Sequence, residues 1–425
     1  MCVVSLHKKN MKKNLHIIAA VFIAFGFNAQ NTEQISLTPG YSNQSYYSFE
    51  NGEVGNVDNT NWDLAFSAGG YGSAVRINGA MGMNLYTYPN GDISDWASVD
   101  TSGLSTWTSQ INSDTDWSVG AFDQQINASD PFDLGWGVYS PITHFITGDS
   151  LYIATWMDGS AKKIQLTQLA SGTYDFIYAD IDGSNEVSAS ISKDDFDGKN
   201  FGYYSISNNA ELDREPLAGD WDVVFTKYVT ELYPGMNYGV TGALVNAGFS
   251  VAKSEGVPVA NADPAGLSFG TAINGIGYDW KSFNMTTFQY DLQDSLAYFV
   301  RNDGSGEIWK INFTSFDGSS TGNIEFNTEL ISAAGYSELG TSTTFTLYPN
   351  PSSGRTVNLI YDISSIGSMG QGFILDMNGQ VVFDFSLENG GLNNKSLHLD
   401  HLRAGAYVVS YQVGSEVLRQ KLILH

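Results

Sequence analysis

Cysteine is nearly absent from this chain, which has 425 residues and a single cysteine, Cys2. One cysteine cannot form an internal disulfide or a thiolate metal cluster. Basic residues are also few, with 20 Lys and Arg against 45 Asp and Glu and a net charge of −25. Nucleic-acid phosphates and anionic membranes attract clustered Lys and Arg, so this balance argues against both as partners.

Histidine is scarce in the central region, where residues 31–344 contain only His144. A serine triad needs a histidine base, and an HExxH zinc site needs two histidine ligands. No P-loop or GxGxxG motif is present. The sequence does not exclude a glycosidase, which uses two paired carboxylates. This region holds 39 acidic and 11 basic residues, so some carboxylates pair by chance and a pair alone indicates no activity. We expect a protein that is not an enzyme.

Long apolar runs are missing except near the start of the chain. Two lysines precede an apolar run at residues 15–27, and a polar stretch follows Ala29. This order is typical of a secretory signal peptide, and the run is shorter than the roughly 20 apolar residues that cross a membrane. We expect a signal peptide at residues 1–30 with its true start at Met11, and no transmembrane span in the mature protein.

Two blocks of sequence recur in the same order along the central region. The first, YYSF with NWDLAF, recurs as YYSI with DWDVVF, at residues 46–49, 61–66, 203–206 and 220–225. The second, DSLYIATWMDGS, matches DSLAYFVRNDGS, at residues 149–160 and 294–305. The repetition predicts a duplicated domain, with copies at residues 42–200 and 201–332.

The hydrophobic pattern predicts strands. Tyr152, Ala154 and Trp156 alternate with their neighbours before a turn containing Asp-Gly-Ser, and no stretch beyond the signal keeps a helical period. The expected fold class is all-β: two tandem, mostly antiparallel β domains followed by a small C-terminal β-sandwich. Trp62 and Trp221 precede apolar runs and are expected to anchor the two cores.

An acidic stretch at residues 180–186 has oxygen-bearing side chains at alternate positions, as calcium loops do. It lacks the spacing of an EF-hand, and a turn that links the two copies is the alternative interpretation. The sequence assigns no metal site.

The last part of the chain differs from the central region in composition and charge. A linker rich in Ser, Gly and Thr at residues 333–344 precedes a nearly neutral block at residues 345–425 with closely spaced strands. Three motifs mark this block, and their residues are Tyr348, Pro349, Asn350 and Pro351, then Asp376, Asn378 and Gly379, then Gly405 and Tyr407.

These motifs resemble the type A C-terminal sorting domain carried by cargo of the type IX, or Por, secretion system. The resemblance implies that the type IX machinery is a partner of the chain. It also implies that the protein is secreted, and either released or attached at the outer-membrane surface.

The repeated YYSF and NWDLAF motifs, together with YGVTGALVNAGFSVAK at residues 238–253, resemble the HmuY-like family of secreted haem-binding proteins. The resemblance implies an all-β fold that clamps haem between hairpins through two axial side chains. Haem iron takes imidazole or thioether ligands, so the candidates in this chain are His144, Met236 and Met285.

A haem or related porphyrin is therefore the first expected ligand. The alternative is a structural or adhesive surface protein that binds glycans or other cells, because exposed Trp and Tyr side chains can stack on sugar rings.

Overall fold

The computed structural model describes residues 31–332, 345–350, 352, 354–363, 370–376, 380–387, 391–413 and 416–425. The expected signal peptide with Met11, the linker at residues 333–344, and Pro351, Asn378 and Gly379 lie outside these residues. Within the described ranges, no helix has the length and apolar character needed to cross a membrane.

The described chain is built from strands, which confirms the all-β class. Its helical segments are short 3₁₀ turns: η1 (Pro39–Tyr41), η2 (Gly79–Met81), η3 (Ile93–Ser98), η4 (Leu104–Thr106), η5 (Ala121–Asp123), η6 (Lys193–Phe196), η7 (Ala218–Asp220), η8 (Val259–Asn261) and η9 (Gly318–Ser320).

The first packed unit is a sandwich of an eight-stranded and a four-stranded sheet. The larger sheet contains β6 (Asn84–Thr87), β7 (Ser109–Gln110), β8 (Gly137–Tyr139), β9 (Ile146–Gly148), β10 (Tyr152–Thr155), β11 (Ala161–Ala170), β12 (Thr173–Asp180) and β13 (Val187–Ser192). The smaller sheet has the order β15 (Ala210–Leu212), β14 (Phe201–Ser205), β4 (Leu64–Ser67) and β5 (Val75–Ile77). Aromatic side chains such as Trp136, Tyr152 and Phe176 fill the space between the sheets and are almost fully buried.

The second packed unit is a sandwich of a five-stranded and a four-stranded sheet. The larger sheet has the order β1 (Asn31–Ser36), β23 (Asn323–Ser332), β22 (Ile308–Phe316), β21 (Leu296–Asn302) and β18 (Phe249–Glu255). The smaller sheet has the order β17 (Met236–Val245), β16 (Val223–Tyr233), β2 (Asn43–Ser48) and β3 (Gly52–Asp58). A separate hairpin joins β19 (Lys281–Asn284) to β20 (Gln289–Leu292).

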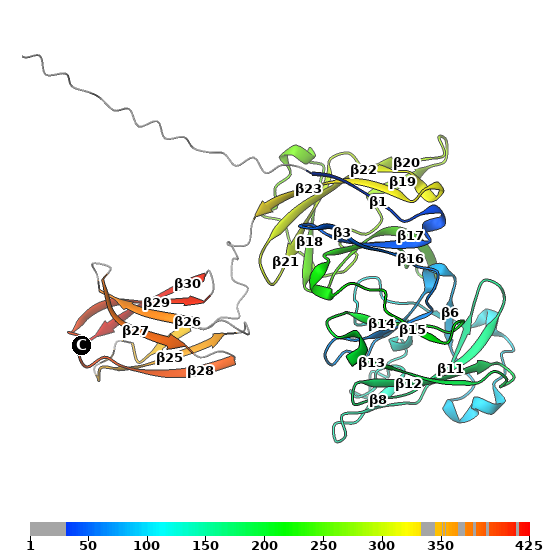
Figure 1. Ribbon diagram of the computed structural model, residues 1–425, viewed down its shortest axis with the longest axis horizontal. Coiled ribbons are helices and arrows are strands. Elements are labelled where there is room, and N and C mark those ends of the chain that lie inside the picture. Colours follow the sequence, from blue (N-terminus) through cyan, green and yellow to red (C-terminus); the bar gives the residue numbers. More distant parts are fainter. Residues whose placement is uncertain are drawn as a thin grey trace, which may run out of the picture.

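Strands are exchanged between the two halves of the body. β2, from the first YYSF motif, pairs with β16 of the DWDVVF motif, and β14, from the YYSI motif, pairs with β4 of the NWDLAF motif. In Figure 1 the blue strands β1 and β3 accordingly lie among the green and yellow strands of the second unit. The expected boundary between residues 200 and 201 therefore does not coincide with the packed units, because sequence similarity marks the copies and not the sheets in which their strands pair.

One hydrogen bond recurs at each exchange. The Asp63 carboxylate accepts from the backbone N–H of Ile206 at 2.7 Å, and the Asp222 carboxylate accepts from that of Phe49 at 2.7 Å. In both cases the aspartate of one WD motif binds the residue that follows the Tyr-Tyr-Ser strand of the other half. This equivalence supports the duplication, which stays a prediction.

The two tryptophans of these motifs do not lie in the main cores, contrary to expectation. Trp221 packs with Tyr46 and Tyr228 on the outer face of the second unit's smaller sheet, and Trp62 packs with Tyr203 on the outer face of the first unit's smaller sheet. Trp117 contacts both clusters. The indole rings therefore form the junction between the units, where the two smaller sheets face each other.

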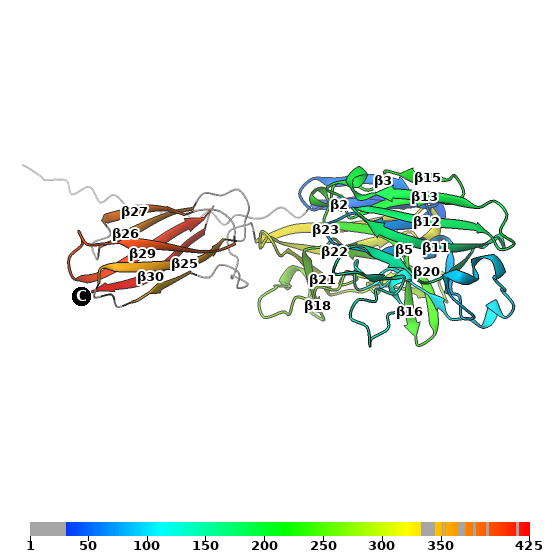
Figure 2. The ribbon, with the colours of Figure 1, turned by 90° about the horizontal axis from the view of Figure 1, so that it is seen from below.

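The C-terminal block is a small β-sandwich, as expected (Figure 2). One sheet has the order β24 (Phe345–Tyr348), β25 (Thr356–Ile363) and β28 (Gly391–His398). The other has the order β27 (Val381–Leu387), β26 (Gly370–Leu375), β29 (Gly405–Val413) and β30 (Glu416–Leu424). Alternating apolar residues such as Leu359, Val409 and Leu422 are fully buried between the sheets.

Candidate ligand groove

A groove of about 790 Å³ lies in the second unit between the β16–β17 hairpin and the β19–β20 hairpin. We call it the hairpin groove. Its lining residues are Gly40, Tyr41, Lys227, Leu232, Tyr238, Gly239, Val240, Thr241, Tyr278, Lys281, Ser282, Phe283, Tyr290 and Ser319.

Local sequence explains both hairpins. β16 and β17 pair from Val223 and Val245 outward to Tyr233 and Met236, and Gly235 supplies the positive φ of 80° that the tight turn needs. In the β19–β20 turn the Asn284 side chain accepts hydrogen bonds from two backbone N–H groups. Asn side chains that accept hydrogen bonds from nearby backbone N–H groups in this way stabilise a tight turn.

Aromatic rings form a connected wall along the groove. The Tyr290 ring packs edge-on against Phe283 and Phe316, with centroids 5.2 Å and 4.7 Å away, and Tyr41 stacks on Phe316 at 6.1 Å. Rings held in such a network present fixed apolar faces to a ligand.

The tips of the two hairpins expose large apolar side chains. Six of the sixteen most exposed large apolar residues in the described part of the chain lie there: Tyr233, Met236 and Tyr238 on one hairpin, and Phe283, Met285 and Phe288 on the other. An exposed cluster of large apolar side chains indicates a binding site, whereas single exposed apolar residues are common on any protein surface.

The groove is free of acidic side chains although the chain around it is strongly acidic. Two of the body's 11 basic residues, Lys227 and Lys281, line it, and neither forms an ion pair with any described residue. The Lys281 ammonium donates to the Thr241 carbonyl at 2.5 Å and lies 4.0 Å from the Trp280 ring centroid. Burial lowers the pKa of Lys281 to about 7. An anionic group in the groove would offset that desolvation.

The three expected haem ligands occupy different places. Met236 begins β17 and Met285 lies in the β19–β20 turn, so they stand at the tips of the two hairpins that border the groove, without lining it. His144 lies in the first unit, in a turn before β9 rather than in the expected strand, and its Nδ1 is 2.7 Å from the Tyr139 hydroxyl. The structure therefore brings the methionines, and not His144, to the groove.

The groove's tyrosines and lysines were not singled out in the sequence. Tyr238 and Tyr290 occupy strand positions, where aromatic residues are common, and isolated lysines carry no motif. Tyrosine is also a known axial ligand of haem, so these side chains add to the candidates.

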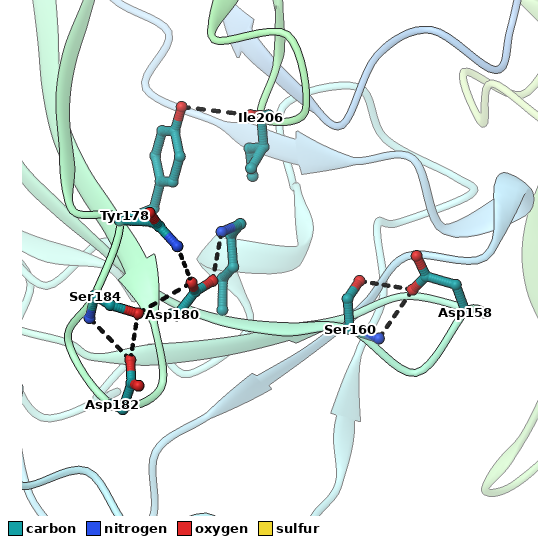
Figure 3. Close-up of polar contacts among 9 residues, drawn as sticks. Asp158, Ser160, Tyr178, Asp180, Asp182, Ser184 and Ile206 are labelled. Atoms are coloured by element: carbon teal, nitrogen blue, oxygen red, sulfur yellow. Dashed lines mark hydrogen bonds and ion pairs between the residues drawn. The ribbon is translucent and has the colours of Figure 1, made fainter.

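The acidic stretch at residues 180–186 is a turn between β12 and β13 within one sheet, not a link between the two copies (Figure 3). Lys162 donates to Asp180 at 2.7 Å, and the Ser184 backbone and hydroxyl donate to Asp182 at 2.9 and 2.6 Å. The carboxylates are thus held by protein donors. In the described part of the chain, no three His, Cys, Asp or Glu side chains are grouped as a metal site.

The sorting motifs serve partly as clasps within the C-terminal sandwich. Asn350 donates to the Lys421 carbonyl at 2.6 Å and accepts from the Ile423 N–H at 2.9 Å, so it ties the start of the block to its final strand. Tyr407 donates to the Arg403 carbonyl at 2.9 Å.

The other described motif residues lie at turns and edges. Asp376 accepts from the Gln380 N–H at 3.0 Å across the β26–β27 turn, and Gly405 begins β29. Tyr348 is 68% exposed, and Pro349 beside it is also exposed. The exposed pair is free to contact another protein.

Comparison with solved structures gives no usable likeness. One match, "Biofilm associated protein - BSP domain", has 8% identity and a TM-score of 0.21, and covers 98% of this chain and 83% of that chain. Another, the trimeric ectodomain of the C. elegans fusion protein EFF-1, has 8% identity and a TM-score of 0.15, with 65% and 68% covered. Scores this low carry no argument. No curated protein matches the chain.

Two family models match the chain. Residues 346–425 match the secretion system C-terminal sorting domain, and residues 40–182 match the HmuY protein family. The first match marks the chain for type IX export to the cell surface or the extracellular space. The chain is thus an exported protein that combines a HmuY-family segment with a C-terminal type IX sorting domain.

Proposed function

We propose that the exported body binds haem or a related porphyrin in the hairpin groove. The observation that carries the proposal is the groove's composition: five aromatic rings, two lysines and no carboxylate, in a body with 39 acidic residues. A porphyrin is a flat apolar ring with carboxylate substituents at one edge, so it needs aromatic faces and a nearby cation.

Different residues of the groove would contact different parts of such a ligand. Phe283 and Tyr290 would contact the ring faces from one hairpin, and Tyr238 from the other. Lys227 and Lys281 would pair with the ligand's carboxylates. Met236 and Met285 at the hairpin tips, or a groove tyrosine, would hold the iron of a haem.

The HmuY-family match supports the same ligand class, and export places the binding body where extracellular porphyrin is met. The groove itself lies mostly beyond residues 40–182, in two hairpins of the second unit, one of which pairs through β16 with β2.

The groove assignment is tested by titrating the chain from residue 31 to residue 425 with iron-free protoporphyrin IX and following tryptophan fluorescence. Trp280 lies under the groove beside Lys281, so a bound ring quenches it. Phe283→Ala and Tyr238→Ala should each weaken binding by about tenfold, since each removes a stacking face.

Tyr71→Ala is the matched control, because Tyr71 is fully exposed in the β4–β5 loop of the first unit. It should bind as tightly as the wild type. Equal affinities for all four proteins, or no quenching at all, would exclude the groove as the porphyrin site.

A further inference from the structure

The ammonium group of Lys281 has a fixed position in the hairpin groove. Lys281 is the first residue of β19, and its Nζ donates to the Thr241 carbonyl at 2.5 Å and to the Tyr278 carbonyl at 3.4 Å. The same atom lies 4.0 Å from the Trp280 ring centroid and 4.6 Å from that of Phe316. Two backbone carbonyls and two aromatic faces therefore hold the cation in place before any ligand arrives.

This fixed cation has no carboxylate partner of its own. An ammonium group carries three N–H donors, and the two carbonyls occupy only two of them. Asp279 is the acidic residue whose charge acts on Lys281, but its carboxylate accepts from the Lys253 ammonium at 3.0 Å and from the Tyr298 hydroxyl at 3.2 Å. One donor of Lys281 is thus open to a ligand, and a ligand carboxylate would supply the missing counter-charge.

Lys227, the other lysine of the groove, is held differently. Its side chain lies across Gly239, where an added Cβ would stand 3.2 Å from Lys227 Cε. Its Nζ forms no ion pair with any described residue. A lysine held by packing alone loses conformational entropy when it pairs with a ligand, whereas Lys281 is already ordered. A ligand carboxylate should therefore gain more from Lys281 than from Lys227.

The aromatic wall of the groove cannot by itself tell one flat ring from another, because stacking faces accept any apolar ring of suitable size. From the fixed and unpaired cation we infer that Lys281 is the specificity-determining residue of the hairpin groove. It selects ligands that carry a free carboxylate at the ring edge over ligands with the same ring whose carboxylates are esterified. The inference rests on the proposed porphyrin function and names the feature by which the groove discriminates among porphyrins.

The test compares protoporphyrin IX with its dimethyl ester, which keeps the ring and the carbonyl oxygens and lacks both negative charges. The chain from residue 31 to residue 425 is titrated with each compound in the same detergent-containing buffer, and tryptophan fluorescence is followed. The wild type should bind the free acid about tenfold more tightly than the ester, because a hydrogen bond between two charged groups is replaced by one to a neutral acceptor.

Lys281→Met keeps an apolar side chain beside the two rings and removes the charge. This variant should bind both compounds alike, with about the affinity of the wild type for the ester. The ratio of the two affinities separates lost recognition from a distorted groove, since distortion weakens both compounds equally. Lys227→Met should lower the ratio by about threefold or less, because its flexible side chain contributes less to an ion pair.

Lys162→Met is the control matched for charge, since it removes one cation from the first unit, where Lys162 pairs with Asp180. It should keep the wild-type ratio. Equal affinity of the wild type for the two compounds, or a full preference for the free acid in Lys281→Met, would overturn the inference and leave the groove as the porphyrin site. If neither compound gave saturable quenching, the porphyrin assignment would fail and the inference with it.

Discussion

At the scale of the residue, the position of a side chain in the fold determines whether it can reach a ligand. Sequence reasoning selected His144, Met236 and Met285 because their side chains ligate haem iron, and the fold brings only the two methionines to the borders of one groove. The groove's lysines and tyrosines carry no sequence signal, since their role depends on strands that meet only after folding.

Substituting a methionine and substituting His144 should affect the haem complex differently. Met236→Ala or Met285→Ala should shift the Soret maximum or weaken hemin binding, because a thioether at a hairpin tip is lost. His144→Ala should leave the spectrum unchanged, because His144 lies in the first unit beside Tyr139. A spectrum altered by His144→Ala alone would move the site away from the groove.

Lys281 gives the body a pH-dependent stability. Burial lowers its pKa from 10.5 to about 7, against a smaller opposing effect of Asp279. Between those pH values the unfolded chain binds more protons than the folded chain, so the free energy of unfolding rises with pH, by on the order of 2 kcal/mol between pH 7 and pH 9.

Urea unfolding at pH 7, 8 and 9 measures this rise. Lys281→Met should flatten it, since the titrating group is gone. Lys162→Met, which removes a partly exposed ion pair with Asp180, should keep the wild-type slope. Identical slopes for wild type and Lys281→Met would contradict the assignment.

The sequence predicted the positions of strands better than it predicted which strands pair with each other. The β10–β11 hairpin follows from period-two alternation and a local turn, and the structure contains it. The exchange of β2 and β14 between halves did not follow, because similarity between copies says nothing about which copy a strand pairs with. The exchange also moved Trp62 and Trp221 from the expected cores to the junction.

The exchanged strands depend on Asp63 and Asp222. Asp63→Ala and Asp222→Ala should each lower the free energy of unfolding by about 1–3 kcal/mol, because each leaves a backbone N–H without its carboxylate partner. Chemical denaturation measures the loss.

Asp213→Ala is the matched control. Its carboxylate pairs with Lys199 at the surface, where an ion pair contributes about 1 kcal/mol or less. If Asp63→Ala and Asp222→Ala destabilised the chain no more than this control, the two hydrogen bonds would not hold the exchange.

At the scale of the whole molecule, the sequence predicted the all-β class and the C-terminal sorting block, and both are confirmed. The acidic body and the all-β class rest on composition and periodicity, and the sorting block rests on the resemblance of its motifs to a known family, none of which needs tertiary information. The hairpin groove and the junction of the two units depend on contacts between segments distant in the sequence, such as Tyr41 with Phe316 and Trp117 with Val245.

The sorting block predicts a secretion phenotype. Removing residues 345–425 should trap the protein in the periplasm, and Asn350→Ala should reduce export because it releases the clasp on the last strand. Asn358→Ala, which loses one exposed bond to Ser396, should be exported normally. Immunoblots of periplasm and medium measure this, and normal secretion of the truncated chain would refute the sorting role.

The central claim is that the body binds porphyrin in the hairpin groove, and a hemin titration of the chain from residue 31 to residue 425 tests it most directly. We predict a shifted Soret band that saturates at one hemin per chain in the micromolar range and weakens about tenfold in Phe283→Ala. Hemin that keeps its free spectrum at micromolar concentration, with no saturable shift, would contradict the account.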